Sequence, residues 1–109
     1  MPTIYKVLGQ SAPSATTDTT LYTVPAATDA VVSTITVANR DSASATFRIA
    51  VRPAGATLAN QHYIAFDCSV GANDTTALTL GLTLDATDVV TVRASTANLS
   101  FSAFGSEIS

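Results

Sequence analysis

The side chains that could act as a nucleophile and its base are a single cysteine, Cys68, and a single histidine, His62. A cysteine nucleophile needs a base within hydrogen-bonding reach to take its proton. Both residues lie in the segment 61–70, QHYIAFDCSV, which is predicted to be a strand, and six residues of extended chain span about 20 Å. We therefore predict no catalytic residues. His62 is expected to be structural or interfacial, and Cys68 to be a small buried hydrophobic residue.

Metal ligands are equally scarce. A structural zinc site takes four cysteine or histidine ligands, and this chain has one of each. Asp85 and Asp88, with Thr87 between them, could offer oxygen atoms to calcium, but their spacing matches no EF-hand loop. Aspartates are common at tight turns because they cap backbone amides, and we interpret Asp85–Asp88 in that way. No metal and no cofactor are predicted, and the protein is not expected to be an enzyme.

Three arginines, Arg48, Arg52 and Arg93, occupy outward positions on their predicted strands. Guanidinium groups on a face of threonine and alanine would suit docking to an acidic partner or to an identical subunit. Simple solubility explains the same pattern equally well, and the sequence leaves both interpretations open. Asp67 is expected on a solvent-facing side, where it could pair with any of these arginines on a neighbouring strand.

Charge is low over the whole chain. Only 12% of the 109 residues are charged, 47% are hydrophobic, and the formal net charge is −3. Nucleic-acid binding needs clustered lysines and arginines that neutralise phosphates, so no nucleic-acid partner is predicted. No run approaches the roughly 18 apolar residues of a membrane helix, and Met1–Gln10 lacks the features of a signal peptide, so no membrane partner is predicted. A weakly charged surface repels other proteins little, which suits packing into an assembly.

The elements that position these side chains are short segments in which Thr, Ser and Ala alternate with Val, Ile, Leu and Phe. Alternation with period two predicts β-strands with one buried face. It is clearest in Ala45–Arg52, Ala77–Leu84 and Asp88–Ala94. The residues expected to point inward are Val31, Ile35, Val37, Phe47, Ile49, Val51, Ile64, Phe66, Cys68, Leu78, Leu80, Leu82, Leu84, Val90, Val92, Leu99, Phe101 and Ala103.

Seven or eight such strands, separated by polar turns, predict an antiparallel β-sandwich of the jelly-roll or immunoglobulin-like class. The chain has no tryptophan and one cysteine, which favours the jelly roll. Residues 1–19 are predicted to form an N-terminal strand and an extended arm, and residues 20–109 the sandwich. The stretch Gly9–Thr20 fits an ordinary loop as well as an arm. The segment Asp85–Asp88 is expected to be a hairpin turn.

Several of these segments resemble small β-sandwich virion proteins of tailed phages, including phages of cyanobacteria and marine bacteria. The resemblance covers roughly residues 20–109 and contains no catalytic motif. The segments are Leu21–Pro25 (LYTVP), Ala30–Arg40 (AVVSTITVANR), Ala45–Gly55 (ATFRIAVRPAG), Asn73–Leu84 (NDTTALTLGLTL) and Asp88–Gly105 (DVVTVRASTANLSFSAFG).

The resemblance implies a non-enzymatic virion protein made in the host cytoplasm. The first expectation is a capsid decoration, or cement, protein bound over joints between major capsid protein subunits; the alternative is a neck, tail or baseplate structural or adhesion protein. Partners would be the major capsid protein or other virion proteins, together with further copies of the chain, and trimers are common for this kind of protein. The N-terminal arm, with Ile4, Tyr5 and Lys6, would lie across a neighbour or add a strand to its sheet.

A domain of host origin with enzymatic or sugar-binding activity is the least favoured hypothesis. Carbohydrate binding normally relies on exposed aromatic side chains. The chain has three tyrosines and four phenylalanines, and the core is expected to need most of them.

Overall fold

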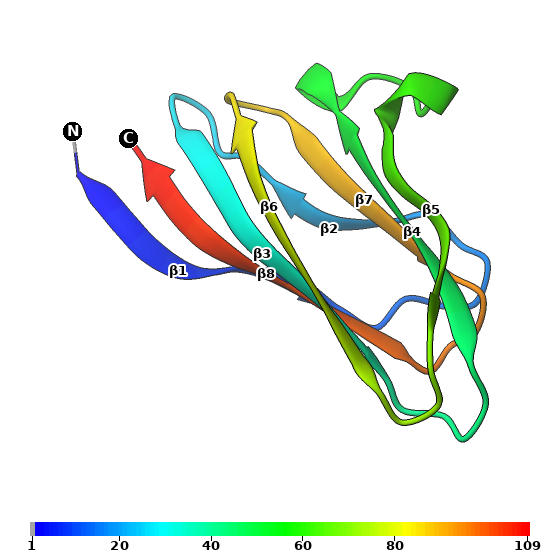
Figure 1. Ribbon diagram of the computed structural model, residues 1–109. Helices are drawn as coiled ribbons and strands as arrows, with labels where there is room; N and C mark the ends of the chain where they lie inside the picture. The colour runs from blue at the N-terminus through cyan, green and yellow to red at the C-terminus, as the bar shows by residue number, and fades with distance from the viewer. Residues whose placement is uncertain (1) are drawn as a thin grey trace.

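The computed structural model describes residues 2–109, and strands make up most of its length (Figure 1). It also contains two short 3-10 helices, Pro53–Gly55 and Asn60–His62. The eight strands are β1 (Thr3–Ser11), β2 (Thr19–Thr23), β3 (Asp29–Asn39), β4 (Ala45–Arg52), β5 (Tyr63–Val70), β6 (Thr75–Leu84), β7 (Val89–Ala94) and β8 (Leu99–Ile108).

The strands form two antiparallel sheets packed face to face. Sheet A has the order β1-β8-β3-β6 and sheet B the order β2-β7-β4-β5. The topology is that of a jelly roll, in which one long hairpin is wound around the core. The antiparallel pairs of this hairpin are β1–β8, β2–β7, β3–β6 and β4–β5. The predicted β-sandwich is confirmed, and of the two classes considered the strand order is that of the jelly roll.

The strand order also shows that the prediction for one turn was wrong. Asp85–Asp88 joins β6 in sheet A to β7 in sheet B, so the prediction of a hairpin turn is wrong. Alternation along the chain shows that two strands follow each other, but it does not show whether they share a sheet. Only the β4–β5 connection stays within one sheet.

The N-terminal segment is integrated into the sandwich. β1 pairs with β8 from Thr3 opposite Ile108 to Ser11 opposite Phe101. Residues 12–18 then cross to sheet B, where the backbone N–H of Thr16 donates to the carbonyl oxygen of Ala94 at 2.7 Å.

The core lies between the inner faces of the two sheets. Phe47 of β4 and Phe101 of β8 meet edge to face, with ring centroids 6.3 Å apart. The inward positions predicted for β4, β7 and β8 are confirmed, except that Val51 is only half-buried. In β6, Leu84 is buried, while Leu78, Leu80 and Leu82 are partly buried against the core.

The inward positions predicted for β3 are partly wrong. Val32, Ile35 and Val37 are buried, whereas Val31 is only half-buried. The pairing of β3 with β8 shifts register between Val32 and Thr34, and this β-bulge moves the strand by one residue relative to the sheet faces. The hydroxyl of Ser33 at the bulge donates to the carbonyl oxygen of Phe104 at 3.1 Å.

β5 departs further from its predicted pattern. Ile64, Phe66 and Cys68 were expected to point inward, but Ile64 is 44% exposed, Phe66 is 54% exposed, and Cys68 is exposed as well. Asp67 has a left-handed backbone with a φ of 51°. The β4–β5 register also shifts twice, so strict alternation does not hold along this edge strand.

Candidate functional site

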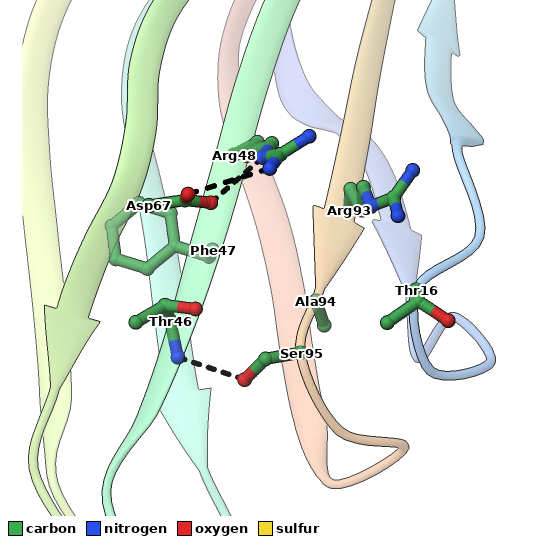
Figure 2. A pocket seen from close by; sticks show the side chains of 8 residues that line it. All are labelled: Thr16, Thr46, Phe47, Arg48, Asp67, Arg93, Ala94 and Ser95. Carbon is green, nitrogen blue, oxygen red and sulfur yellow. Dashed lines mark hydrogen bonds and ion pairs between the residues drawn. The ribbon is translucent and has the colours of Figure 1, made fainter.

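A hollow of about 180 Å³ lies on sheet B where β4, β5 and β7 meet residue 16 (Figure 2). Arg48 of β4 and Arg93 of β7 lie directly opposite each other in the strand register. The residues that line the hollow are Thr16, Thr46, Phe47, Arg48, Asp67, Arg93, Ala94 and Ser95. Two of the three predicted surface arginines, Arg48 and Arg93, therefore meet at one place.

Arg48 is held from two sides. Its Nε donates to Asp67 Oδ1 at 2.7 Å and its Nη2 to Asp67 Oδ2 at 3.3 Å. The guanidinium carbon lies 4.0 Å from the centroid of the Phe66 ring, a cation–π contact. The hydrogen bond from Arg48 holds the pKa of the Asp67 carboxyl below its ordinary value. The predicted pairing of Asp67 with one of the arginines is confirmed, and Arg48 is the partner.

Arg93 is held more loosely. Its Nη1 lies 3.8 Å from Asp18 Oδ1, and its side chain is 32% exposed. Like charges directly opposite on neighbouring strands repel, and Asp67 and Asp18 offset that repulsion from either side. The hollow can therefore offer guanidinium donors to an acidic group of a partner.

Arg52 lies outside the hollow and forms hydrogen bonds within the molecule. Its Nε donates to Thr91 Oγ1 at 3.1 Å, and its Nη1 donates to the carbonyl oxygen of Ala56 at 3.0 Å. These bonds fasten the short helix after β4 to the sheet. Arg52 does not line the hollow beside Arg48 and Arg93.

The other residues considered for chemistry make turns. His62 Nδ1 accepts a hydrogen bond from the backbone N–H of Ala59 at 3.0 Å. Asp88 accepts from the backbone N–H groups of Ala54 at 2.8 Å and Asp85 at 2.9 Å, so the interpretation of these aspartates as turn caps is confirmed. Within residues 2–109, no group of three or more His, Cys, Asp or Glu side chains could hold a metal ion.

The second candidate surface is the N-terminal half of β1, which contains Ile4, Tyr5 and Lys6. β1 is an edge strand of sheet A, and it lies at the margin of the molecule with no strand on its outer side (Figure 1). Ile4 is 52% exposed, Tyr5 83% and Val7 49%. Sequence reasoning missed Val7, although the apolar residues on both faces of this segment were a signal for it.

Unlike Ile4 and Tyr5, Lys6 forms an ion pair within the molecule. Its Nζ lies 2.9 Å from Glu107 Oε1, and the Tyr22 hydroxyl donates to Glu107 Oε2 at 2.5 Å. The bonds from Tyr22 and Lys6 hold the pKa of Glu107 below its ordinary value. Burial, reinforced by Glu107, raises the pKa of Tyr22. This cluster links β1 and β8 to β2 of the other sheet.

A hollow of about 480 Å³ lies beside this edge. Tyr5 and Phe104 contribute aromatic rings, and Val31 and Gly105 contribute further apolar surface. The expectation that the core needs most aromatic residues is wrong: Tyr22, Phe47 and Phe101 are buried, while Tyr5, Phe66 and Phe104 are exposed and Tyr63 is half-buried.

Comparisons with known proteins add no relative: no protein-family model matches the chain, and no curated protein matches it. No helix among residues 2–109 is long and apolar enough to cross a membrane.

Proposed function

We propose that this chain is a non-enzymatic structural protein of a phage virion, and specifically a capsid decoration protein that binds over joints between major capsid protein subunits. The observation that carries the proposal is the open β1 edge, on which Ile4, Tyr5 and Val7 are exposed. Exposed edge strands with apolar side chains pair readily with other chains. A protein that functions in an assembly can use such an edge as a binding surface.

Three further points support this role. The segments quoted above resemble small virion proteins of tailed phages. The jelly roll recurs in viral capsid proteins, although by analogy alone a fold does not determine function. Low charge over the chain leaves broad faces that can approach other subunits with little repulsion.

Binding over a joint would strengthen a capsid by connecting subunits. A rigid sandwich that contacts two or more subunits makes each further contact intramolecular, so modest contacts resist separation together. The arginine-lined hollow on sheet B would receive an acidic group of the capsid subunit. The β1 edge would then be left for a neighbouring chain.

The proposal is tested by locating the protein on purified virions. Electron cryomicroscopy should place its density over joints of the head, and quantitative mass spectrometry should give a copy number proportional to that of the major capsid protein. Particles lacking the protein should rupture at a lower temperature and regain resistance when the purified protein is added. A few copies confined to the tail would contradict the decoration role.

One observation favours the alternative of a neck, tail or baseplate protein with an adhesion role. Tyr63 and Phe66 of β5 meet edge to face at 4.9 Å between ring centroids, and Arg48 lies over the Phe66 ring. Exposed aromatic rings beside hydrogen-bonding groups are suited to binding sugars. This alternative predicts that the protein binds host cells and that Phe66→Ala abolishes the binding; a protein that binds neither cells nor tail components would contradict it.

A further inference from the structure

The four edge strands of the sandwich differ in how they are protected. In β5, Asp67 has a left-handed backbone and the register shifts twice. β6 is interrupted by Gly81, with a φ of 66°, and β2 has only five residues and one register shift. Short edges and bulges prevent unwanted strand pairing. The stretch Thr3–Val7 of β1 has neither, because it pairs with β8 in unbroken register.

The side chains of this stretch do not protect the edge either. Lysine on an edge strand normally discourages pairing by its charge, but here Lys6 is neutralised by Glu107 at 2.9 Å. Ile4, Tyr5 and Val7 are roughly half or more exposed. Thr3–Val7 is therefore an edge with free backbone groups, apolar side chains and no uncompensated charge.

The open stretch has a defined end. The pairing of β1 with β8 shifts register between Val7 and Gly9. At Gly9 the strand approaches β2 so closely that an added Cβ would overlap the carbonyl oxygen of Leu21. The regular, unbulged part of the β1 edge is therefore Thr3–Val7.

We propose that two copies of this chain pair through Thr3–Val7, antiparallel and centred on Tyr5, so that their A sheets become one continuous sheet. Tyr5 then lies opposite the partner's Tyr5, Thr3 opposite the partner's Val7, and Ile4 opposite the partner's Lys6. Aromatic side chains directly opposite each other stabilise antiparallel pairs. The stem of Lys6 covers Ile4 while its ammonium group stays with Glu107.

Two-fold symmetry and the extent of the open stretch select this register. A two-fold axis perpendicular to the sheet keeps each side chain opposite one on the same face, so the axis passes through a residue pair. An axis at Lys6 would place Ile4 opposite Leu8, the residue at which the β1–β8 register shifts, and such a bulge disrupts regular pairing. An axis at Ile4 would pair only Thr3–Tyr5 within the open stretch and leave Lys6 and Val7 outside it. Only an axis at Tyr5, the middle of the five-residue stretch Thr3–Val7, pairs every residue of that stretch with another residue of the same stretch.

Disulfide cross-linking tests both the pairing and the register. In a Cys68→Ser background, Tyr5→Cys should give a cross-linked dimer on mild oxidation, because directly opposite residues lie within the Cα separation that a disulfide spans. Thr3→Cys and Val7→Cys should each remain uncross-linked alone, and an equal mixture of the two should cross-link. Thr79→Cys on β6, the other edge of sheet A, is the control.

Either of two cross-linking results would contradict the proposal. Cross-linking of Tyr5→Cys no faster than that of Thr79→Cys would overturn the pairing, and strong cross-linking of Thr3→Cys alone would overturn the register. Because only purified protein is used, the result is independent of the proposed role on a capsid.

Solution mass gives a second test that needs no oxidation. The protein should sediment at twice its chain mass of 11.1 kDa. Tyr5→Lys should weaken the dimer by roughly tenfold or more, because it places two lysines opposite each other at the axis. Thr79→Lys should leave the mass unchanged. A monomer at all concentrations, or a trimer, would overturn the proposal.

Discussion

Phe47 and Arg48 are neighbours in the chain but lie on opposite faces of sheet B. Phe47 is 2% exposed and packs edge to face on Phe101. Arg48 lies on the outer face, fixed by Asp67 and the Phe66 ring. Stability should therefore depend on the first residue and surface recognition on the second.

Replacing Phe47 by alanine tests the core. Phe47→Ala should lower the free energy of unfolding by about 3–5 kcal/mol, because it removes buried ring surface and leaves a cavity. Arg48→Ala should change it far less, since exposed ion pairs contribute little. Chemical denaturation of both variants checks this, and a neutral Phe47→Ala would contradict the assigned inner face of β4.

Glu107 should make stability depend on pH. Its pKa is below the ordinary value of 4.5 in the folded protein, so folding favours its charged form. The resulting stabilisation is fully present above the ordinary value and is lost as the pH falls through the lower, folded value.

The matched comparison is wild type against Glu107→Gln. The wild type should be more stable at pH 7, and the difference in unfolding free energy should shrink as the pH falls below 4.5. Comparing differences removes contributions from other carboxylates that titrate in both proteins. A difference that is constant from pH 7 to strong acid would contradict a stabilising role for the charge.

β-Bulges determine where the strands depart from the alternation predicted from the sequence. Sheet A has register shifts at Leu8 in β1 and at Ser33 in β3, both on strands that pair with β8. Beside them, Gly105 lies opposite Val32. The backbones approach so closely there that an added Cβ would overlap the carbonyl oxygen of Val31.

Gly105→Ala should therefore destabilise the protein by roughly 1–3 kcal/mol, because the strands must separate to admit a methyl group. Gly71→Ala is the matched control, since its added Cβ would meet Asp74 at an ordinary 3.7 Å. Thermal unfolding of both variants gives the comparison. Equal melting temperatures would show that β8 can shift without cost.

These bulges also explain how far the sequence could predict the structure. β4 begins and ends at the residues that alternation predicted, and β7 begins one residue later than predicted. These predictions succeed because the pairing between β4 and β7 contains no bulge. In β3 and β5 an extra or left-handed residue reverses the pattern midway, and Ser33 and Asp67 are ordinary strand-surface residues in sequence. The meeting of Arg48 with Arg93 needed the strand order, which alternation does not contain.

The two candidate surfaces lie on different sheets. The hollow with Arg48 and Arg93 is on sheet B, and the open edge is β1 of sheet A. One surface can bind an acidic partner while the other pairs with a second copy. A protein with two independent binding surfaces can connect two other molecules, which a protein with one such surface cannot do.

Arg93→Ala tests the first surface on particles. Under the proposed decoration role, it should weaken binding of the protein to capsids from which it has been removed by about tenfold, because arginine contacts commonly dominate interfaces. Arg40→Ala is the charge-matched control: Arg40 bonds to Ser100 and Ala97, away from the hollow. Binding can be followed by co-sedimentation with the particles. Equal loss in both variants would point to net charge instead of a specific contact.

The pairing of β1 with β8 has a consequence for how the protein is made. Thr3 lies opposite Ile108, so β1 acquires its neighbour only after β8 has been synthesised and has left the ribosome. Sheet A therefore forms late in the synthesis of this domain, and distant pairings of this kind fold slowly. Until then the apolar side chains of β1 are exposed in the nascent chain, which makes the newly synthesised protein a natural client for a chaperone.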